Sequence, residues 1–113
     1  MKQGIYNWPD LVSGDTIDAM PFTIAVNGAA PSAALSSVRI SIYKDGVTAI
    51  EKTSGAGITI ISAANWQFEL DEVAGSETDI AVGFYNVDVE TTDADGVVKT
   101  YITGNLNILP SAP

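Results

Sequence analysis

The sequence contains no cysteine and no histidine. Their absence excludes disulfide scaffolds, thiolate zinc sites, cysteine nucleophiles and the histidine base of a serine triad. Metal binding by carboxylates and acid–base work by a carboxylate pair remain open. The 113 residues suffice for one domain. A domain of this size buries about two-thirds of its unfolded surface without a metal or a crosslink.

Basic side chains are also scarce. Five Lys and Arg residues face 14 Asp and Glu residues, which gives a net charge of −9. The basic residues are scattered singly, at Lys2, Arg39, Lys44, Lys52 and Lys99. Because neutralising phosphates requires clustered Lys and Arg, we expect no nucleic-acid partner. The same charge disfavours anionic membrane surfaces.

Long apolar runs are missing as well. The N-terminal stretch MKQGIYNWPD lacks the continuous apolar region of a signal peptide. No window approaches the roughly 20 apolar residues of a membrane span. We therefore expect no membrane association, and a chain that stays in the cytoplasm unless something larger carries it out.

What is present is the period-2 alternation of β-strands, clearest over residues 83–108. Tyr85, Val87 and Val89 alternate there with polar residues. The sequence Asp95-Gly96 then lies where a primed hairpin turn requires positive φ, and β-forming residues resume at Val97. The pattern predicts one long hairpin. Gly104 interrupts its second strand, which predicts a bulge or a close approach of another backbone segment.

Shorter strands with the same alternation precede this hairpin. We predict them at residues 22–26, 37–44, 47–52, 57–61 and 66–70. Residues 71–79 are acidic and turn-like, with room for one helical turn. Turn signals recur roughly every 8–12 residues, and no window shows the period of a long helix. The sequence predicts an all-β fold, a single antiparallel immunoglobulin-like β-sandwich of about seven to nine strands.

The core of this sandwich must be held by packing, because the Cys-Trp-Cys set of antibody domains is missing. The candidates are the apolar residues at inward strand positions. They are Phe22, Ile24, Val26, Val38, Ile40, Ile42, Ile58, Ile60, Phe68, Leu70, Tyr85, Val87, Val89, Leu106 and Ile108.

Three patterns resemble ligand sites, and each is better explained as a turn or loop. Residues 93–96 have the D-x-D-G form of a calcium loop but lack its later ligands, which favours a hairpin turn. The carboxylates of residues 69–79 favour a solvated loop over a glycosidase pair. The glycines of residues 55–57 precede no phosphate-binding helix. We expect no catalytic, cofactor-binding or metal-binding residue, and no enzyme activity.

The aromatic residues leave one question open. Exposed aromatics on a β-sandwich can stack on sugars or anchor a protein interface, whereas buried ones fill the core. For Trp66, at the start of a strand, we favour the core. For Tyr6 and Trp8, which precede the first clear strand, interface and core both remain open.

The order of turns and strands resembles a known family. The segments are Gly14-Asp15-Thr16, Phe22-x-Ile24-x-Val26, a loop with Pro31, Val38-x-Ile40-x-Ile42, Gly57-Ile58-Thr59-Ile60, Gly83-x-Tyr85-x-x-Asp88 and Thr100-x-Ile102-x-Gly104-x-Leu106-x-Ile108. Over residues 13–109 this order is similar to small tailed-bacteriophage virion proteins, specifically the immunoglobulin-like domains at the N-terminus of upper-baseplate proteins. The Ala-rich loop at 29–34 departs from the family, which usually has an Asp-Leu-Thr-like element there.

The resemblance implies a non-enzymatic structural protein of a virion, in the tail, baseplate, neck or capsid. It would be assembled in the host cytoplasm, contact other virion proteins and form a homo-oligomer in the particle. The alternative is a carbohydrate-binding or host-surface adhesion module. A sugar-binding face needs two or three coplanar exposed aromatics, and most aromatics here are at core positions.

We divide the chain into an N-terminal arm (residues 1–12), the sandwich (13–109) and a C-terminal tail (110–113). The arm mixes apolar residues with Gly4, Asn7, Pro9 and Asp10, and we expect that it cannot run as a regular strand. Its apolar side chains must be buried somewhere, and a neighbouring subunit is one recipient. The predicted assembly interface consists of Ile5, Tyr6, Trp8, Leu11 and Leu109. The alternative, that the arm folds back onto its own sandwich, stays open.

Overall fold

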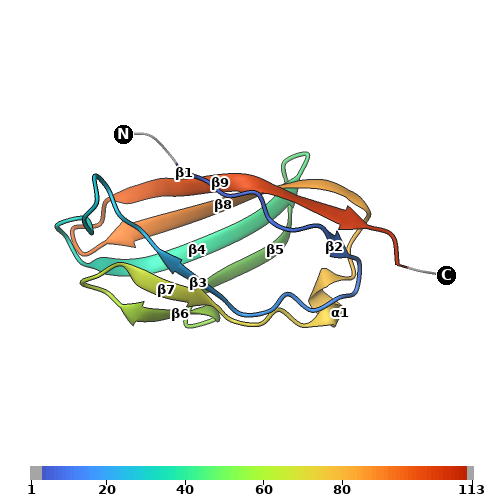
Figure 1. Cartoon of the computed structure of the whole chain (residues 1–113), viewed down its shortest axis with the longest axis horizontal. Helices are drawn as coiled ribbons and strands as arrows, with labels where there is room; N and C mark the ends of the chain where they lie inside the picture. Colours follow the sequence, from blue (N-terminus) through green and yellow to red (C-terminus); the bar gives the residue numbers. More distant parts are fainter. Residues whose placement is uncertain (1–3, 112–113) are drawn as a thin grey trace.

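The computed structural model describes residues 4–111, and their structure is almost entirely β. The strands are β1 (Gly4–Ile5), β2 (Leu11–Val12), β3 (Met20–Thr23), β4 (Leu35–Lys44), β5 (Val47–Ser54), β6 (Gly57–Ser62), β7 (Gln67–Leu70), β8 (Gly83–Asp93) and β9 (Val98–Leu109), with one helical turn α1 (Gly75–Thr78) (Figure 1). The predicted all-β class is confirmed. No helix in the described part is long and apolar enough to cross a membrane.

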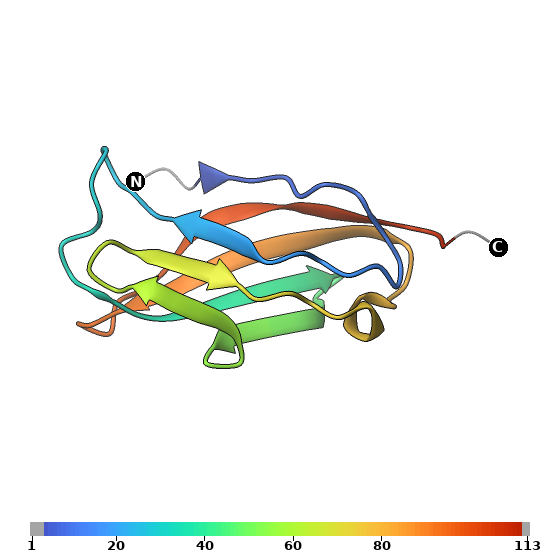
Figure 2. The ribbon, with the colours of Figure 1, turned by 60° about the horizontal axis from the view of Figure 1, so that its bottom comes forward.

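The described strands form one continuous sheet in the order β1-β9-β8-β4-β5-β6-β7-β3, and β2 also pairs with β9. Most pairs are antiparallel, whereas β1 and β2 run parallel to β9. β6 joins β5 in parallel through only two residue pairs, Thr53–Gly57 and Ser54–Ile58. The sheet curls over at this junction, so that β3, β7 and β6 lie over the long strands (Figure 2). The molecule is therefore a curled half-barrel rather than two separate sheets.

The strand order is nevertheless immunoglobulin-like. The neighbours β9, β8, β4 and β5 follow the G-F-C-C′ order of a variable-type domain, and β6, β7 and β3 follow D-E-B. Near the start of β8 the Tyr85 hydroxyl donates a hydrogen bond to the Ala81 carbonyl, at 2.6 Å. A tyrosine that bonds back to its own upstream backbone marks the same corner in immunoglobulin folds. Val87, fully buried, takes the position of the second cysteine.

The predicted long hairpin is confirmed, with β8 and β9 paired from Gly83–Ile108 to Thr92–Val98. Its turn differs from the prediction, because Gly96 has positive φ and Asp95 does not. The Asp93 carboxylate accepts the N–H groups of Asp95 at 2.9 Å and Val97 at 3.0 Å. That cap supports a wider turn with one left-handed glycine. The β4–β5 hairpin has the primed turn instead, since Asp45 and Gly46 both have positive φ.

The core agrees with the sequence prediction except at Phe22, Val26 and Ile60, which are only half-buried. Trp66 is buried, as predicted, and its indole N–H donates to the Ala33 carbonyl at 2.8 Å. The structure adds core residues that the prediction did not include, all but Ile50 outside the predicted strands. They are Trp8, Ile17, Leu35, Ile50 and Val73.

Candidate functional site: the seam between the sheet edges

The curled sheet leaves its two edges facing each other. One edge is residues 4–12 beside β9, and the other is β3 with its continuation to residue 27. We call the space between these two segments the seam. In Figure 2 the two segments are the dark-blue ribbon of residues 4–12 and the lighter blue arrow of β3.

The N-terminal edge is part of its own domain. The N–H groups of Tyr6 and Trp8 donate to the carbonyls of Thr103 and Asn105, both at 2.9 Å. β2 continues the same parallel pairing, with Leu11 opposite Ile108. The expectation of no regular strand is right for residues 6–10, where Pro9 has no N–H to donate, and wrong for the short strands on either side.

Gly104 explains how this edge can lie so close to β9. A Cβ atom at Gly104 would overlap the carbonyl oxygen of Tyr6, so only glycine leaves room for the crossing segment. The predicted close approach is therefore confirmed. The bulge lies elsewhere, between Val89 and Glu90, whose partners on β9 are Ile102 and Thr100.

Aromatic rings bridge the middle of the seam. The Phe22 ring on β3 lies 6.4 Å from that of Tyr6 and 6.2 Å from that of Trp8, measured between centroids. Phe22 also stacks on Phe68 at 5.2 Å, which connects the bridge to the core. Such contacts contribute about 0.5–1.5 kcal/mol each beyond the area that they bury. The seam is therefore closed at its centre.

The five residues predicted as an assembly interface differ in their exposure. Ile5 is 78% exposed and Tyr6 is 38% exposed. Leu11 and Leu109 are half-buried beside β9 and β2. Trp8 is only 6% exposed and belongs to the domain's own core, so it is unavailable to a neighbour while the domain is closed. Within the segment, the exposed interface candidates are Ile5 and Tyr6.

Two clefts flank the aromatic bridge. The larger has a volume of ≈ 820 Å³ and is lined by residues 4–6, residues 23–27, Tyr101 and Ile102, none of them charged. Its volume lies in the range of about 300–1,000 Å³ that is usual for ligand sites. The smaller, of ≈ 240 Å³, lies between residues 8–11, residues 16–20 and Leu106, and includes Asp10 and Asp18. We take the larger cleft as the candidate site.

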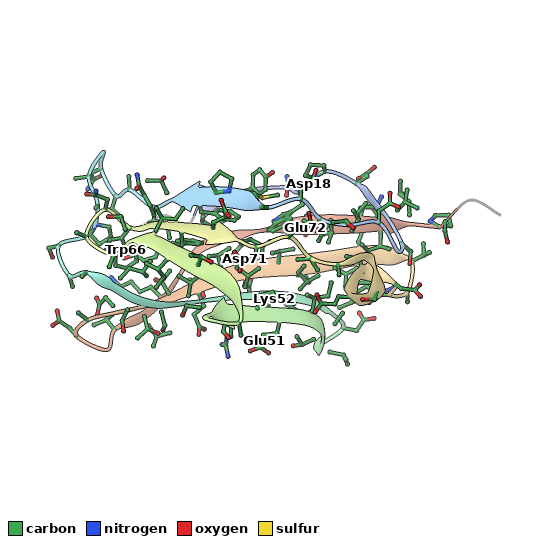
Figure 3. The ribbon with its side chains drawn as sticks, turned by 90° about the horizontal axis from the view of Figure 1, so that it is seen from below. Asp18, Glu51, Lys52, Trp66, Asp71 and Glu72 are labelled. Carbon is green, nitrogen blue, oxygen red and sulfur yellow. The ribbon has the colours of Figure 1, made fainter. Side chains whose placement is uncertain are left out.

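Two of the acidic residues at 69–79 make contacts with neighbouring strands. Asp71 accepts a hydrogen bond from the Thr59 hydroxyl at 2.9 Å, and Glu77 pairs with Lys52 at 2.6 Å. Figure 3 labels Asp71, Glu72 and Lys52 around β7 and β5. Across residues 4–111 no three His, Cys, Asp or Glu side chains are grouped so that they could hold a metal ion. Residues 71–79 form a loop with one helical turn, as predicted.

The outer face of the long strands is polar. Arg39 on β4 lies 2.9 Å from Glu90 on β8 and 3.9 Å from Glu51 on β5. The Tyr43 hydroxyl donates to the Asp88 carboxylate at 3.0 Å, and this hydrogen bond raises the pKa of Tyr43 above its ordinary value. This face is a solvated surface of paired charges, in contrast to the uncharged lining of the larger cleft.

No protein-family model matches the sequence, and no curated protein matches it. Among solved structures, the chain is similar to CopC from Methylosinus trichosporium OB3b, with a TM-score of 0.50 and 14% identity over 98% of this chain and 87% of that one. The V domain of amphioxus IgVJ-C2 gives a TM-score of 0.32 and 18% identity over 89% and 99%. The first likeness shows the fold alone, and the second is too weak to carry an argument.

Proposed function

We propose that this protein is a non-enzymatic structural component of a bacteriophage virion, which assembles through contacts along its seam. The observation that carries the proposal is the pairing of Ile5, 78% exposed, with an uncharged cleft of ≈ 820 Å³ at an open sheet edge. Exposed apolar residues beside an open edge are typical of assembly surfaces. The sequence resemblance over residues 13–109 supports the virion setting.

Within that role the curled sheet works as a sandwich of two layers. β9, β8, β4 and β5 form one layer and β6, β7 and β3 form the other, joined at the short β5–β6 pairing. The N-terminal edge of the seam is attached to the first layer through its pairing with β9. Copies of the chain and other virion proteins are the proposed partners.

Incorporation into particles tests this function. We expect the chain in purified phage particles by mass spectrometry, and we expect Ile5→Glu to lower its incorporation at least tenfold. Ile61→Glu is the matched control, because Ile61 is 59% exposed on β6, away from the seam. Absence of the chain from particles, or equal incorporation of the two variants, would contradict the proposal.

A carbohydrate-binding or adhesion module is the second candidate, and two tyrosines favour it. Tyr6 and Tyr101 line the larger cleft, and neither hydroxyl has a hydrogen-bond partner among residues 4–111. The rings do not form a flat platform, however. Tyr101 packs edge-on against Trp66 at 5.6 Å, and Tyr6 packs against Trp8 at 5.8 Å. Titration with neutral oligosaccharides, followed by NMR at the two tyrosines, tests this candidate.

A further inference from the structure

We propose that the larger cleft of the seam is a docking site for an extended, uncharged segment of a partner polypeptide, which hydrogen-bonds to both sheet edges. The inference rests on the proposed function, because it names the kind of contact through which the seam would assemble.

The N-terminal edge has free backbone groups that face the seam. Tyr6 and Trp8 direct their N–H groups to β9. Backbone groups of successive residues in a strand point to opposite sides, so the N–H and C=O groups of Ile5 in β1 point away from β9. Backbone groups of this kind need partners, which water or another strand can supply.

The opposite edge offers a matching set. The Ile24 N–H donates to the Trp66 carbonyl at 3.1 Å, which continues the pairing of β3 with β7. By the same alternation, Thr23 and Ala25 direct their N–H and C=O groups to the seam. Pro21 precedes them on this side and has no N–H, as is usual for proline on an edge strand. The free donors of this edge therefore begin at Thr23.

These groups lie where the cleft is. Its lining includes residues 4–6 from one edge and 23–27 from the other. The second stretch is extended only to Val26, because Asn27 has positive φ and begins a turn. At about 3.3 Å per residue, residues 23–26 are about 13 Å long and match a strand of about four residues. The rings of Tyr6, Trp8 and Phe22 close the seam at one end of this slot. An extended segment would add to the sheet here, as in other complexes formed by strand addition.

The lining determines the chemistry of the segment. No charged side chain among residues 4–111 lines the cleft, although the chain carries a net charge of −9. Burying an unpaired charge there would be costly, so the docked residues are uncharged, with apolar or β-branched side chains at alternate positions.

A second copy is a poorer donor of such a segment. Within the described part of the chain, every strand already belongs to the protein's own sheet. A second copy could donate one of these strands only by unpairing it. The occupant that the structure favours is a segment of another polypeptide.

A strand supplied in cis tests the site on the full-length chain. A seven-residue strand of alternating Thr and Val is joined to Met1 through a flexible Gly-Ser linker, which gives a high effective concentration. We expect amide hydrogen exchange at Ile5, Thr23 and Ala25 to slow at least tenfold, and the melting temperature to rise by several degrees. The matched control carries alternating Thr and Glu, and we expect no protection from it.

Two substitutions at one edge residue sharpen the test. Ala25 is exposed, so a larger side chain fits there. Ala25→Pro removes an N–H that faces the seam, while Ala25→Val keeps it. We expect the first to abolish the added protection and the second to preserve it. Unchanged exchange with the Thr-Val strand, or equal protection by the Thr-Glu strand, would overturn the proposal.

Other occupants would also show themselves. Edge protection that appears in the unextended protein as its concentration rises would mean a second copy and overturn the choice of partner. Oligosaccharides that shift the Tyr6 and Tyr101 signals without protecting the edge amides would identify a sugar site instead. Because these measurements use the isolated protein, their failure leaves the particle-incorporation test of the proposed function standing.

Discussion

The long strands and the seam are held together by different contacts. β8 pairs continuously with β9 on one side and with β4 on the other, over inward residues such as Val87 and Val89 that are 1% exposed. The seam has two-residue strands, a bridge of aromatic rings and backbone groups left free on both sides. Complete pairing leaves nothing for a partner to bind, whereas incomplete closure leaves an edge and a cleft. This difference is why we propose the seam as the assembly surface.

The largest effect is expected where the two regions meet. Phe68 on β7 is 0% exposed and stacks on Phe22, which is half-buried in the seam. Phe68→Ala is expected to lower the free energy of unfolding by about 3–5 kcal/mol. Phe22→Ala should cost about half as much, because it leaves a cavity open to the cleft. Denaturant unfolding of both variants checks this. An equal or larger loss for Phe22 would mean that the seam is as tightly packed as the core.

Residues of the N-terminal segment should also differ in how much they contribute to stability. Trp8→Ala is expected to cost about 3 kcal/mol, since the indole is buried, while Ile5→Ala should change stability by less than about 0.5 kcal/mol. Removal of residues 1–11 should destabilise the isolated domain at least as much as Trp8→Ala. A deletion that left the melting temperature unchanged would restore the detached arm that the sequence suggested.

Substitution of Gly104 on β9 should displace the segment around Tyr6 that forms one edge of the seam. Gly104→Ala places a methyl group against the Tyr6 carbonyl and should cost about 1–3 kcal/mol, as overpacking does. Exchange of the Tyr6 and Trp8 amides should become faster, because the crossing segment must move away.

Gly96→Val is the control for Gly104→Ala. It should cost about 1–2 kcal/mol through the positive φ of residue 96, with no effect on the Tyr6 amide. If Gly104→Ala left exchange at Tyr6 unchanged, the close approach would be wrong.

The sequence predicted the regular part of the fold because strand alternation is a local signal. Residues 85–89 alternate as the strand requires, and Gly96 has the positive φ that a turn there needs, although the turn is wider than the predicted primed one. The seam could not be predicted from the sequence, because it depends on how far the sheet curls. Trp8 is buried by Phe22, a residue on the opposite edge, and no local pattern records that contact. Gly104 gave the one advance signal, a glycine inside a strand with another backbone against it.

The smallest effect is expected on the polar outer face. The hydrogen bond to Asp88 raises the pKa of Tyr43 above the value of 10.0 that it has when unfolded. Above about pH 10 the folded state therefore retains a proton that the unfolded state has lost, so stability falls as pH rises through the folded pKa. Tyr43→Phe should reduce this loss, and spectrophotometric titration should show one high-pH tyrosine fewer. An unchanged titration would rule out the bond to Asp88.

Assembly through the seam can be measured by hydrogen exchange at its two edges, compared between the isolated chain and assembled particles. We expect fast exchange at Ile5, Thr23 and Ala25 in the isolated protein, and at least tenfold slower exchange in the particle. Amides within the β8–β9 pairing should exchange slowly in both. Particles that contain the chain with its edge amides as exposed as in the free protein would contradict the claim that it assembles through the seam.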